Sequence, residues 1–457
     1  MKIQDFYIKI KDFIQSRPAV CLVLAFGILN LIFAGLLCLP IATNKFGSAG
    51  FEVSFFTSSS AISGTGLLVV PTATYWSIFG KIILLLTMQV GGLGVMTMAS
   101  MLGMIVSRHL GLTTKILTSN DIKGSKFGEL GALLRIVLVT TFSIEFLITI
   151  LLIPRFLELK ENVLDAIWNA IFFAVSCFTN SGFDLSTQGL GTFTSQWSIA
   201  IPMIFGLEMG AIGFPVIRNL WECLRMRSLK KLSLNTKVTL LFSSVLNALI
   251  VVWFFAAEWG SKNLFGEKVF SNNSSHAADL LLQAWTTRAS GFAIGDPSQL
   301  SESTKLLSEI WMFIGGAPAS TCAGIKVTTV AILVYAVIAE LRGREDITAF
   351  HKRFPSSSLR VAITIMIAGL SIVLLFTLVL NTMTPDSLEV VLFDTISAYA
   401  NCGLTQGLAT TLPAFGHFLM GILMILGRLG TMTVAAALMK RDRVHFIRYP
   451  EESIILG

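Results

Sequence analysis

The sequence is poor in charged residues. Asp, Glu, Lys and Arg make up 13% of the 457 residues, whereas hydrophobic residues make up 54%. A soluble domain carries about a quarter charged residues. Long runs contain no charged residue at all, among them 19–44, 82–107, 238–257 and 361–385. A helix needs about 20 apolar residues to cross the hydrocarbon core of a bilayer, so the composition excludes an ordinary soluble domain and predicts an all-α polytopic membrane protein.

The sequence also lacks the motifs of common enzyme classes. It contains no His-Glu-x-x-His, no Gly-x-Ser-x-Gly, no Gly-x-x-x-x-Gly-Lys-Ser/Thr and no paired aspartates inside an apolar run. These patterns carry hydrolase and nucleotide chemistry, so we expect no enzyme and no catalytic residue. The six cysteines have neither paired nor metal-ligand spacing. We expect small buried thiols at most of Cys21, Cys38, Cys177, Cys223, Cys322 and Cys402.

The positive charge is unevenly distributed along the chain. A net charge of +7 would suit nucleic acid, but most Lys and Arg fall in five segments: 2–17, 108–126, 218–237, 342–360 and 440–448. Cytoplasmic segments of membrane proteins carry this kind of excess. We therefore expect a multi-pass protein of the inner (plasma) membrane, with both termini in the cytoplasm and an even number of crossings. Its basic segments are expected to meet membrane lipid or a cytosolic partner, and no nucleic acid.

An internal repeat is the most informative feature that is present. Four short segments end in a turn of small residues, and their glycines are spaced 116, 109 and 112 residues apart. These glycines are Gly66, Gly182, Gly291 and Gly403. A second glycine follows each of them after 24 to 28 residues, at Gly91, Gly210, Gly315 and Gly427. Small residues let membrane helices pack closely, and we expect that role for 91–94 and 210–213.

Each repeat has the same order of elements. A full-length apolar helix comes first, at about 19–40, 133–153, 238–257 and 361–381. A stretch too short to span a bilayer then follows, at about 52–62, 165–178, 277–288 and 387–400. The turn and another long helix complete the unit. We expect four such units (M1-P-M2: helix, re-entrant pore helix with filter turn, helix) in pseudo-four-fold arrangement, with eight transmembrane helices. The expected units are 1–110, 111–235, 236–345 and 346–457, the last including the C-terminal tail.

Four such turns can line one cation pathway. Non-helical backbone at membrane depth is tolerated only where it is buried in protein or lines a water-filled cavity. Rings of backbone carbonyls replace the hydration shell of a permeating cation, and the short helices would aim their negative ends at the same place. Glu145 and Glu208 lie in apolar helices, where packing or pairing inside the bundle is favoured over ion coordination. Arg288 is expected to anchor the third turn through backbone carbonyls.

The third inner helix is expected to be broken. The apolar stretch 309–340 contains Gly-Gly-Ala-Pro-Ala-Ser-Thr-Cys-Ala-Gly at 315–324, a poor helix by propensity. We expect a gating loop beneath the filter, with a proline kink as the alternative. Arg428 interrupts the fourth inner helix, and a charge there must be paired or hydrated. Carbonyls of 315–324 are its expected partners. Lys326 either has a similar role or extends toward the cytosol.

The four turns, the Gly-x-x-Gly helices and the ending Ile-Arg-Tyr-Pro at 447–450 resemble the Trk/Ktr/HKT superfamily over essentially the whole chain, and most closely its Ktr-type membrane subunits. The resemblance implies potassium uptake through a channel-like subunit. The filter residues that it implies are Gly66, Gly182, Gly291, Gly403, Thr65, Ser181, Ser290, Cys402, Asn180 and Asn401. The gating residues that it implies are Gly315, Gly316, Ala317, Pro318, Gly324, Lys326 and Arg428. Family members with serine at the first filter position are associated with sodium, so four glycines favour potassium.

The resemblance also implies partners. Ktr-type subunits form homodimers on a cytosolic nucleotide-binding ring of the KtrA-like, RCK-domain kind, so nucleotide is expected only on that partner. K+ is then the transported ion and Na+ a candidate activator. The apolar end of the chain, 451–457, is expected at the subunit interface. Broken helices and repeats also mark sodium-coupled secondary transporters, although these usually show two halves. A sodium-coupled transporter of another small ion or solute is therefore the alternative.

Overall fold

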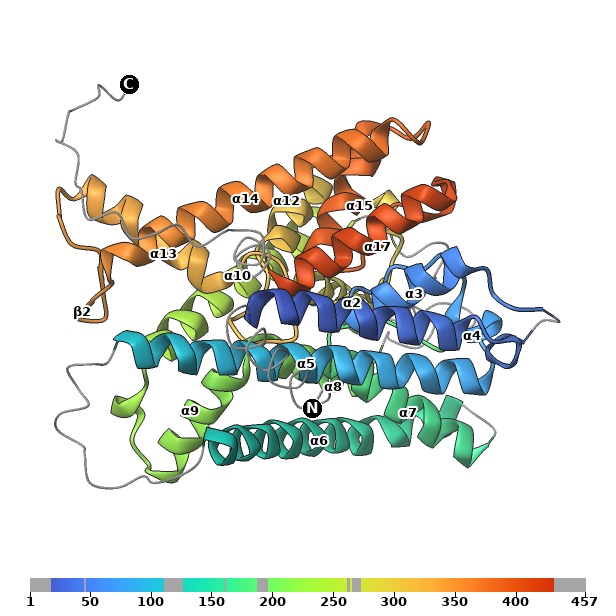
Figure 1. Cartoon of the computed structure of the whole chain (residues 1–457), viewed down its shortest axis with the longest axis horizontal. Helices are drawn as coiled ribbons and strands as arrows, with labels where there is room; N and C mark the ends of the chain where they lie inside the picture. The colour runs from blue at the N-terminus through green and yellow to red at the C-terminus, as the bar shows by residue number, and fades with distance from the viewer. Residues whose placement is uncertain are drawn as a thin grey trace, which may run out of the picture.

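The computed structural model describes residues 18–44, 47–110, 126–159, 162–186, 196–260, 264 and 273–430. The basic segments 2–17 and 440–448, the motif at 447–450 and the end at 451–457 lie outside the described residues. The described chain is mostly helical, with long helices running side by side along the long axis of the molecule (Figure 1). A two-stranded hairpin, β1 (Thr348–Ala349) and β2 (Lys352–Arg353), is the sheet that the described residues form.

The helices that correspond to the expected full-length and inner helices lie mainly in the apolar runs. They are α2 (Pro18–Leu37), α5 (Ile78–Leu110), α6 (Lys126–Leu159), α8 (Trp197–Ile212), α9 (Phe214–Arg225), α10 (Leu234–Ala257), α12 (Glu302–Phe313), α13 (Val327–Leu341), α14 (Ser356–Asn381) and α17 (Ala414–Leu429). By length and composition, three helices among the described residues can cross a membrane: most of α6, all of α10 and most of α14. The bent pair α8 and α9 would be a fourth. The expected number of eight stays a prediction.

Large apolar side chains cover the outer faces of these helices. Phe146 on α6 is 67% exposed and Leu378 on α14 is 64% exposed. Water would make such a surface unfavourable, whereas lipid does not. The outward faces of α6 and α14 therefore match a hydrocarbon environment.

Four short helices lie at the positions expected for the pore helices. They are α3 (Phe51–Ser63), α7 (Val163–Phe178), α11 (Asn273–Ala289) and α15 (Leu388–Ala400). The helix α11 begins one turn earlier than expected. Each short helix packs against the long helix before it and the helix after it, and also against a helix from elsewhere in the chain: α3 against α17, α7 against α5, α11 against α8 and α15 against α12. These cross-contacts link the first and last parts of the chain.

The remaining elements are short connections. They are η1 (Pro40–Ala42), α4 (Thr72–Tyr75), η3 (Leu229–Lys231), η4 (Pro297–Gln299) and α16 (Leu408–Thr411). The helix α9 and the β1–β2 hairpin lie at one end of the molecule, opposite α4 (Figure 1). The basic segments 218–237 and 342–360 therefore lie at the same end.

Two interruptions shape the middle of the molecule. The third inner helix stops at Phe313 and resumes at Val327, so the break expected from composition is present. The second inner helix, expected to be continuous, bends by 101° between α8 and α9. The bend is at Gly213, whose φ of 86° and ψ of 144° are accessible to glycine but rarely to other residues.

The second set of glycines lets helices approach the ends of the short helices. A Cβ added at Gly91 would lie 2.7 Å from the carbonyl carbon of Ile62, and one at Gly427 would lie 2.8 Å from that of Tyr399. Such distances are closer than real Cβ contacts allow, so only glycine fits. Close packing at 91 and 210 is as expected, because a Cβ at Gly210 would likewise lie 2.5 Å from Nδ2 of Asn180.

We predict that Gly91→Ala destabilises the protein by about 1–3 kcal/mol, because overpacking against a backbone carbonyl forces the helices apart. Thermal unfolding in detergent, followed by fluorescence-detected size-exclusion chromatography, measures the change. Gly35→Ala on α2 is the matched control, since its Cβ would meet nothing within 4 Å. An equal melting temperature for both variants would contradict the packing role.

Candidate functional site

The four repeat glycines meet at one place in the structure. A Cβ added at Gly66 would lie 3.2 Å from the Cα of Gly182, and one at Gly182 would lie 2.6 Å from the Cα of Gly291. One at Gly291 would lie 2.9 Å from the Cα of Gly403. Segments more than 100 residues apart in sequence are therefore in direct backbone contact. Side chains at these positions would occupy the point at which the turns converge.

Backbone carbonyls surround this point. The carbonyl oxygen of Thr65 would lie 2.8 Å and that of Cys402 3.0 Å from a Cβ at Gly291, while the carbonyl carbon of Ser181 would lie 3.3 Å from one at Gly66. Each of these residues directly precedes a repeat glycine. The convergence point is thus lined by main-chain oxygens rather than by carboxylates, and carbonyl oxygens are ligands of monovalent cations.

Three of the four turns share one backbone conformation. Gly66, Gly182 and Gly403 have φ of 88°, 68° and 88°. The residues two positions earlier are also left-handed, with φ of 68° at Gly64, 54° at Asn180 and 52° at Asn401. Gly291 lies outside the left-handed region. The third turn is therefore built differently from the other three.

A serine six residues before the glycine holds each of the three similar turns. The hydroxyl oxygen of Ser60 accepts the N–H of Gly66 at 3.0 Å, and that of Ser397 accepts the N–H of Gly403 at 2.9 Å. In the second turn, Ser176 donates to the carbonyl of Phe183 at 2.7 Å. These serines were not among the predicted filter residues, although all three lie six residues before a repeat glycine in the sequence.

The third repeat replaces this serine by a different device. Trp285 lies six residues before Gly291. Gln283 provides the hydrogen bonds to the backbone of this turn instead. Oε1 of Gln283 accepts the N–H groups of Ile294 at 2.9 Å and Gly295 at 3.1 Å. The altered support accompanies the altered backbone of this turn.

Side chains of the predicted filter residues mostly bond to protein. Nδ2 of Asn401 donates to Oγ1 of Thr65 at 2.6 Å and to the carbonyl of Met424 at 3.0 Å, which joins the fourth turn to the first. Sγ of Cys402 contacts the carbonyl of Thr287 at 3.1 Å. These contacts brace the turns from behind. They leave the main-chain carbonyls, rather than the Asn side chains, facing the convergence point.

The second turn is braced in the same way. Nδ2 of Asn180 donates to Oγ1 of Thr321 at 2.6 Å, and Oγ of Ser181 contacts Sδ of Met88 at 2.7 Å. The hydroxyl of Ser290, in the third turn, is buried and has no hydrogen-bond partner within the described part of the chain. The turns are therefore held unequally.

The break in the third inner helix forms a closed loop, 314–326. Its two ends are tied together by Gly315 N–H to Ile325 O at 2.9 Å and Ile325 N–H to Phe313 O at 3.1 Å. The predicted residues Gly315, Gly316, Ala317, Pro318 and Gly324 all lie in it. The loop is buried at Ala317 and Cys322, so it occupies the interior of the bundle.

The loop 314–326 and the bend of the second inner helix supply each other's missing backbone hydrogen bonds. The last carbonyls of a helix have no partner within that helix. Here the carbonyl of Gly210 accepts the N–H of Thr321 at 3.1 Å, and that of Ala211 accepts the N–H of Ala317 at 2.9 Å. In return, the N–H of Phe214 bonds to the carbonyl of Ala319 at 3.2 Å. The two interruptions therefore form one structural unit.

Thr321, which was not among the predicted gating residues, connects this unit to the turns. Its hydroxyl donates to the carbonyl of Phe178, the last residue of α7, at 3.1 Å and accepts from Asn180. Its carbonyl accepts from Nη1 of Arg428. A single buried residue thus touches the second turn, the bent helix and the fourth inner helix.

As predicted, the Arg428 side chain donates to a backbone carbonyl of the loop. It is 3% exposed, and its second terminal nitrogen reaches the carbonyl of Gly91 at 3.4 Å. A Cβ at Gly64, the C-cap of α3, would lie 3.6 Å from Nη1 of Arg428. The guanidinium therefore sits at the negative end of a helix dipole. Lys326 also serves the loop, with Nζ donating to the carbonyl of Cys322 at 2.5 Å.

The other intramembrane charges lie away from the convergence point. Arg288 donates from Nη1 to Oδ1 of Asn247 at 2.5 Å and from Nη2 to Oγ of Ser243 at 3.1 Å. Its Nη1 also reaches the carbonyl of Ser243 at 3.4 Å, so Arg288 ties the end of α11, directly before the third turn, to α10. The expected anchoring of that turn through backbone carbonyls stays a prediction. Glu208 accepts from Asn247 and Trp285, and Glu145 accepts from Gln89 at 3.1 Å. Both acids bond inside the bundle, as expected.

Comparison with known proteins places this architecture in a family. The family model described as TrkH, cation transport protein, matches residues 26–445. The chain is 30% identical over 455 residues to the Ktr system potassium uptake protein B of Bacillus subtilis, covering 98% of this chain and 99% of that one. It is also 28% identical over 455 residues to the potassium/sodium uptake protein NtpJ of Enterococcus hirae, covering 97% of this chain and 98% of that one.

A solved structure shows the same fold. The potassium transporter TrkH from Vibrio parahaemolyticus superposes with a TM-score of 0.70 at 16% identity, over 91% of this chain and 83% of that one. The family model spans most of the chain, including all four repeat glycines and the interrupted helix. Members of this family are transporters rather than enzymes. The chain therefore belongs to the TrkH family of cation transport proteins.

Proposed function

We propose that this chain is the ion-translocating, channel-like subunit of a Ktr-type potassium uptake system. The observation that carries the proposal is the meeting of Gly66, Gly182, Gly291 and Gly403 at one point lined by main-chain carbonyls. Carbonyl rings compensate a cation for its lost hydration shell. The Bacillus subtilis relative is named as a potassium uptake protein, which supports this cation.

The proposed architecture is four M1-P-M2 units in pseudo-four-fold arrangement with eight crossings. The units are 1–110, 111–235, 236–345 and 346–457. The support is that each short helix packs against its own flanking helices and against one helix of the preceding unit, with α3 completing the circle through α17. Such a ring brings the C-terminal ends of all four short helices together, where their dipoles favour a cation.

The proposed transported ion is K+, with Na+ as a candidate activator. Glycine at all four filter positions supports potassium, as the resemblance implies. The Enterococcus hirae relative is named as a potassium/sodium uptake protein, so sodium passage is the alternative that an uptake assay must test. The third turn, with its different backbone, is the place where the four-fold symmetry is weakest.

The proposed gate is the loop 314–326. It lies between the bend of α8–α9 and Arg428, and Thr321 joins all of these to the second turn. A loop held by hydrogen bonds to several helices has discrete alternatives when those bonds exchange. Movement of the loop would open the path beneath the turns.

We further propose a homodimer in the inner membrane, on a cytosolic KtrA-like ring of RCK domains that carries the nucleotide. Both termini would be cytoplasmic. The basic segments 218–237 and 342–360 lie at one end of the molecule (Figure 1), which supports a single cytoplasmic face. The name of the Bacillus subtilis relative refers to a Ktr system, which supports a partner component.

Substitution of filter glycines tests the ion pathway. We predict that Gly66→Ser, Gly182→Ser and Gly403→Ser each reduce discrimination between potassium and sodium about 10-fold or more, since one lost carbonyl ligand is a loss of the order of a hydrogen bond to a charged group. Uptake of both ions by a potassium-auxotrophic host, with and without the cytosolic subunit, measures the ratio.

The matched control is Gly407→Ser, which also has positive φ (106°) but meets nothing within 4 Å. It separates backbone strain from loss of the filter. Wild-type affinity and selectivity in all three filter variants would refute the proposed pathway.

The gate is tested at Thr321. We predict that Thr321→Val raises the uptake rate several-fold, because the isosteric change removes the hydroxyl that bonds to Phe178 and Asn180 at a typical cost of about 1 kcal/mol per bond. Arg428→Ala and a short deletion within 316–323 should act in the same direction. Rates are measured in reconstituted vesicles.

Thr239→Val is the control, because the buried Thr239 hydroxyl has no partner within the described residues. Unchanged transport in the Thr321 variant, or an equal change in the control, would count against the gate.

The dimer is tested at the C-terminus. We predict that deleting 451–457 shifts the purified protein from dimer toward monomer, since an apolar end is expected to be buried. Native mass spectrometry in detergent distinguishes the two masses. A truncated chain that stays fully dimeric, or a full-length chain that is monomeric at micromolar concentration, would overturn the proposal.

A further inference from the structure

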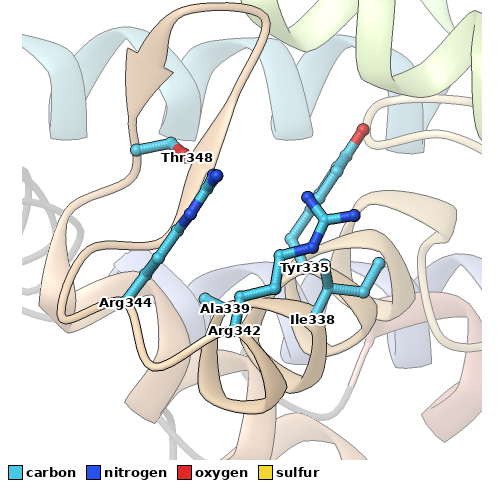
Figure 2. Close-up of a pocket in the computed structure, with 6 residues that line it drawn as sticks. All are labelled: Tyr335, Ile338, Ala339, Arg342, Arg344 and Thr348. Atoms are coloured by element: carbon cyan, nitrogen blue, oxygen red, sulfur yellow. The ribbon is translucent and has the colours of Figure 1, made fainter.

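A cavity lies at the end of α13, away from the ion pathway. Its volume is about 200 Å³, and it is lined by the last turns of α13 and by the segment that leads into the β1–β2 hairpin (Figure 2). The residues that line it are Tyr335, Ile338, Ala339, Arg342, Arg344 and Thr348. No residue of the four turns or of the loop 314–326 lines this cavity. The cavity therefore needs a separate explanation.

Two guanidinium groups share this small space. Arg342 is the C-cap of α13 and Arg344 follows two residues later, and Figure 2 shows both side chains extending into the region between Thr348 and Tyr335. Within the described part of the chain, neither side chain forms an ion pair or a hydrogen bond. The nearby pair of Arg353 and Asp346, 2.9 Å apart, is complete in itself. Both arginines are exposed to solvent, and an anion bound between them would offset the repulsion of their like charges.

The walls of the cavity suit a phosphate group. Arginine presents planar pairs of N–H donors that match phosphate oxygens, and Thr348 adds a hydroxyl. The ring of Tyr335 is held by the rings of Phe242 and Phe354, at centroid distances of 5.5 and 6.0 Å. This wall is therefore fixed in place before a ligand binds.

An apolar stripe on α13 leads to the two arginines. Val334, Val337 and Leu341 are 39%, 59% and 82% exposed, at helical spacing on one side of the helix. Leu341 directly precedes Arg342. An exposed apolar stripe that ends at paired cations matches an acyl chain joined to an anionic head, whereas a free phosphate would make no use of the stripe.

We propose that this cavity binds the phosphate group of an anionic membrane phospholipid, with the acyl chains along the exposed face of α13. The site lies at the end of the molecule that also carries α9 and the hairpin (Figure 1). Anionic lipid attracts arginines that lie close to the membrane surface. The test is a direct measurement of lipid binding, which does not depend on transport.

The test uses native mass spectrometry of the purified full-length chain in detergent, titrated with phosphatidylglycerol or with phosphatidylcholine of the same acyl chains. We expect tighter binding of phosphatidylglycerol. Arg342→Gln with Arg344→Gln should weaken that binding about 10-fold or more, by the contribution of two arginines near a membrane surface. Millimolar inorganic phosphate should not displace the lipid.

The matched control is Arg225→Gln with Arg227→Gln, which removes two equally spaced, exposed arginines at the end of α9. It should leave the difference between the two lipids unchanged. Thr348→Val, which removes the hydroxyl without altering charge, should weaken binding about 2- to 5-fold, as expected for one hydrogen bond, and serves if the double variant does not fold. Equal effects of the two double variants, equal binding of both lipids, or displacement by inorganic phosphate would each overturn the proposal.

Discussion

Backbone polar groups that leave a helix inside a membrane have no water to bond, and each unsatisfied group costs several kcal/mol. In this chain the carbonyls released at the end of α8 are bonded by the loop 314–326, and the N–H at the start of α9 is bonded by the same loop. Without the other, each interruption would lack the backbone hydrogen bonds that now join the two. Their mutual satisfaction allows a bent helix and a broken helix to coexist in the middle of the bundle, and the proposed gate depends on this arrangement.

The same constraint explains the way in which the turns are built. Each turn ends a short helix whose last carbonyls need partners or an ion. Ser60 and Ser397 bond the N–H groups of the turn from within their own helix, which leaves carbonyls free to face the common point. Asn180 and Asn401 bond outward to neighbouring elements. The side chains therefore hold the turns, and the main-chain carbonyls remain at the point where the turns converge.

The buried charge of Arg428 is subject to the same constraint. Arg428 has its terminal nitrogens on the carbonyls of Thr321 and Gly91. An arginine can remain buried when several main-chain oxygens accept hydrogen bonds from its guanidinium, because hydrogen bonds to a charged group offset part of its lost hydration. Arg428 thereby links the loop to the first and fourth parts of the chain, which lie far from it in sequence.

The sequence by itself determined the elements and their repetition. Apolar runs specify helices because the bilayer requires their length and hydrophobicity, and the regular spacing of the glycines located the four turns. Poor helix propensity at 315–324 predicted the broken helix, and the charge of Arg428 within an apolar helix predicted that it needs partners. The tertiary structure alone decided which groups satisfy one another. The bend at Gly213, the pairing of Arg288 with α10, the different third turn and the central place of Thr321 all depend on contacts between residues distant in the chain. Hydrogen bonding between such residues depends on packing geometry, which hydrophobic periodicity and residue spacing do not encode.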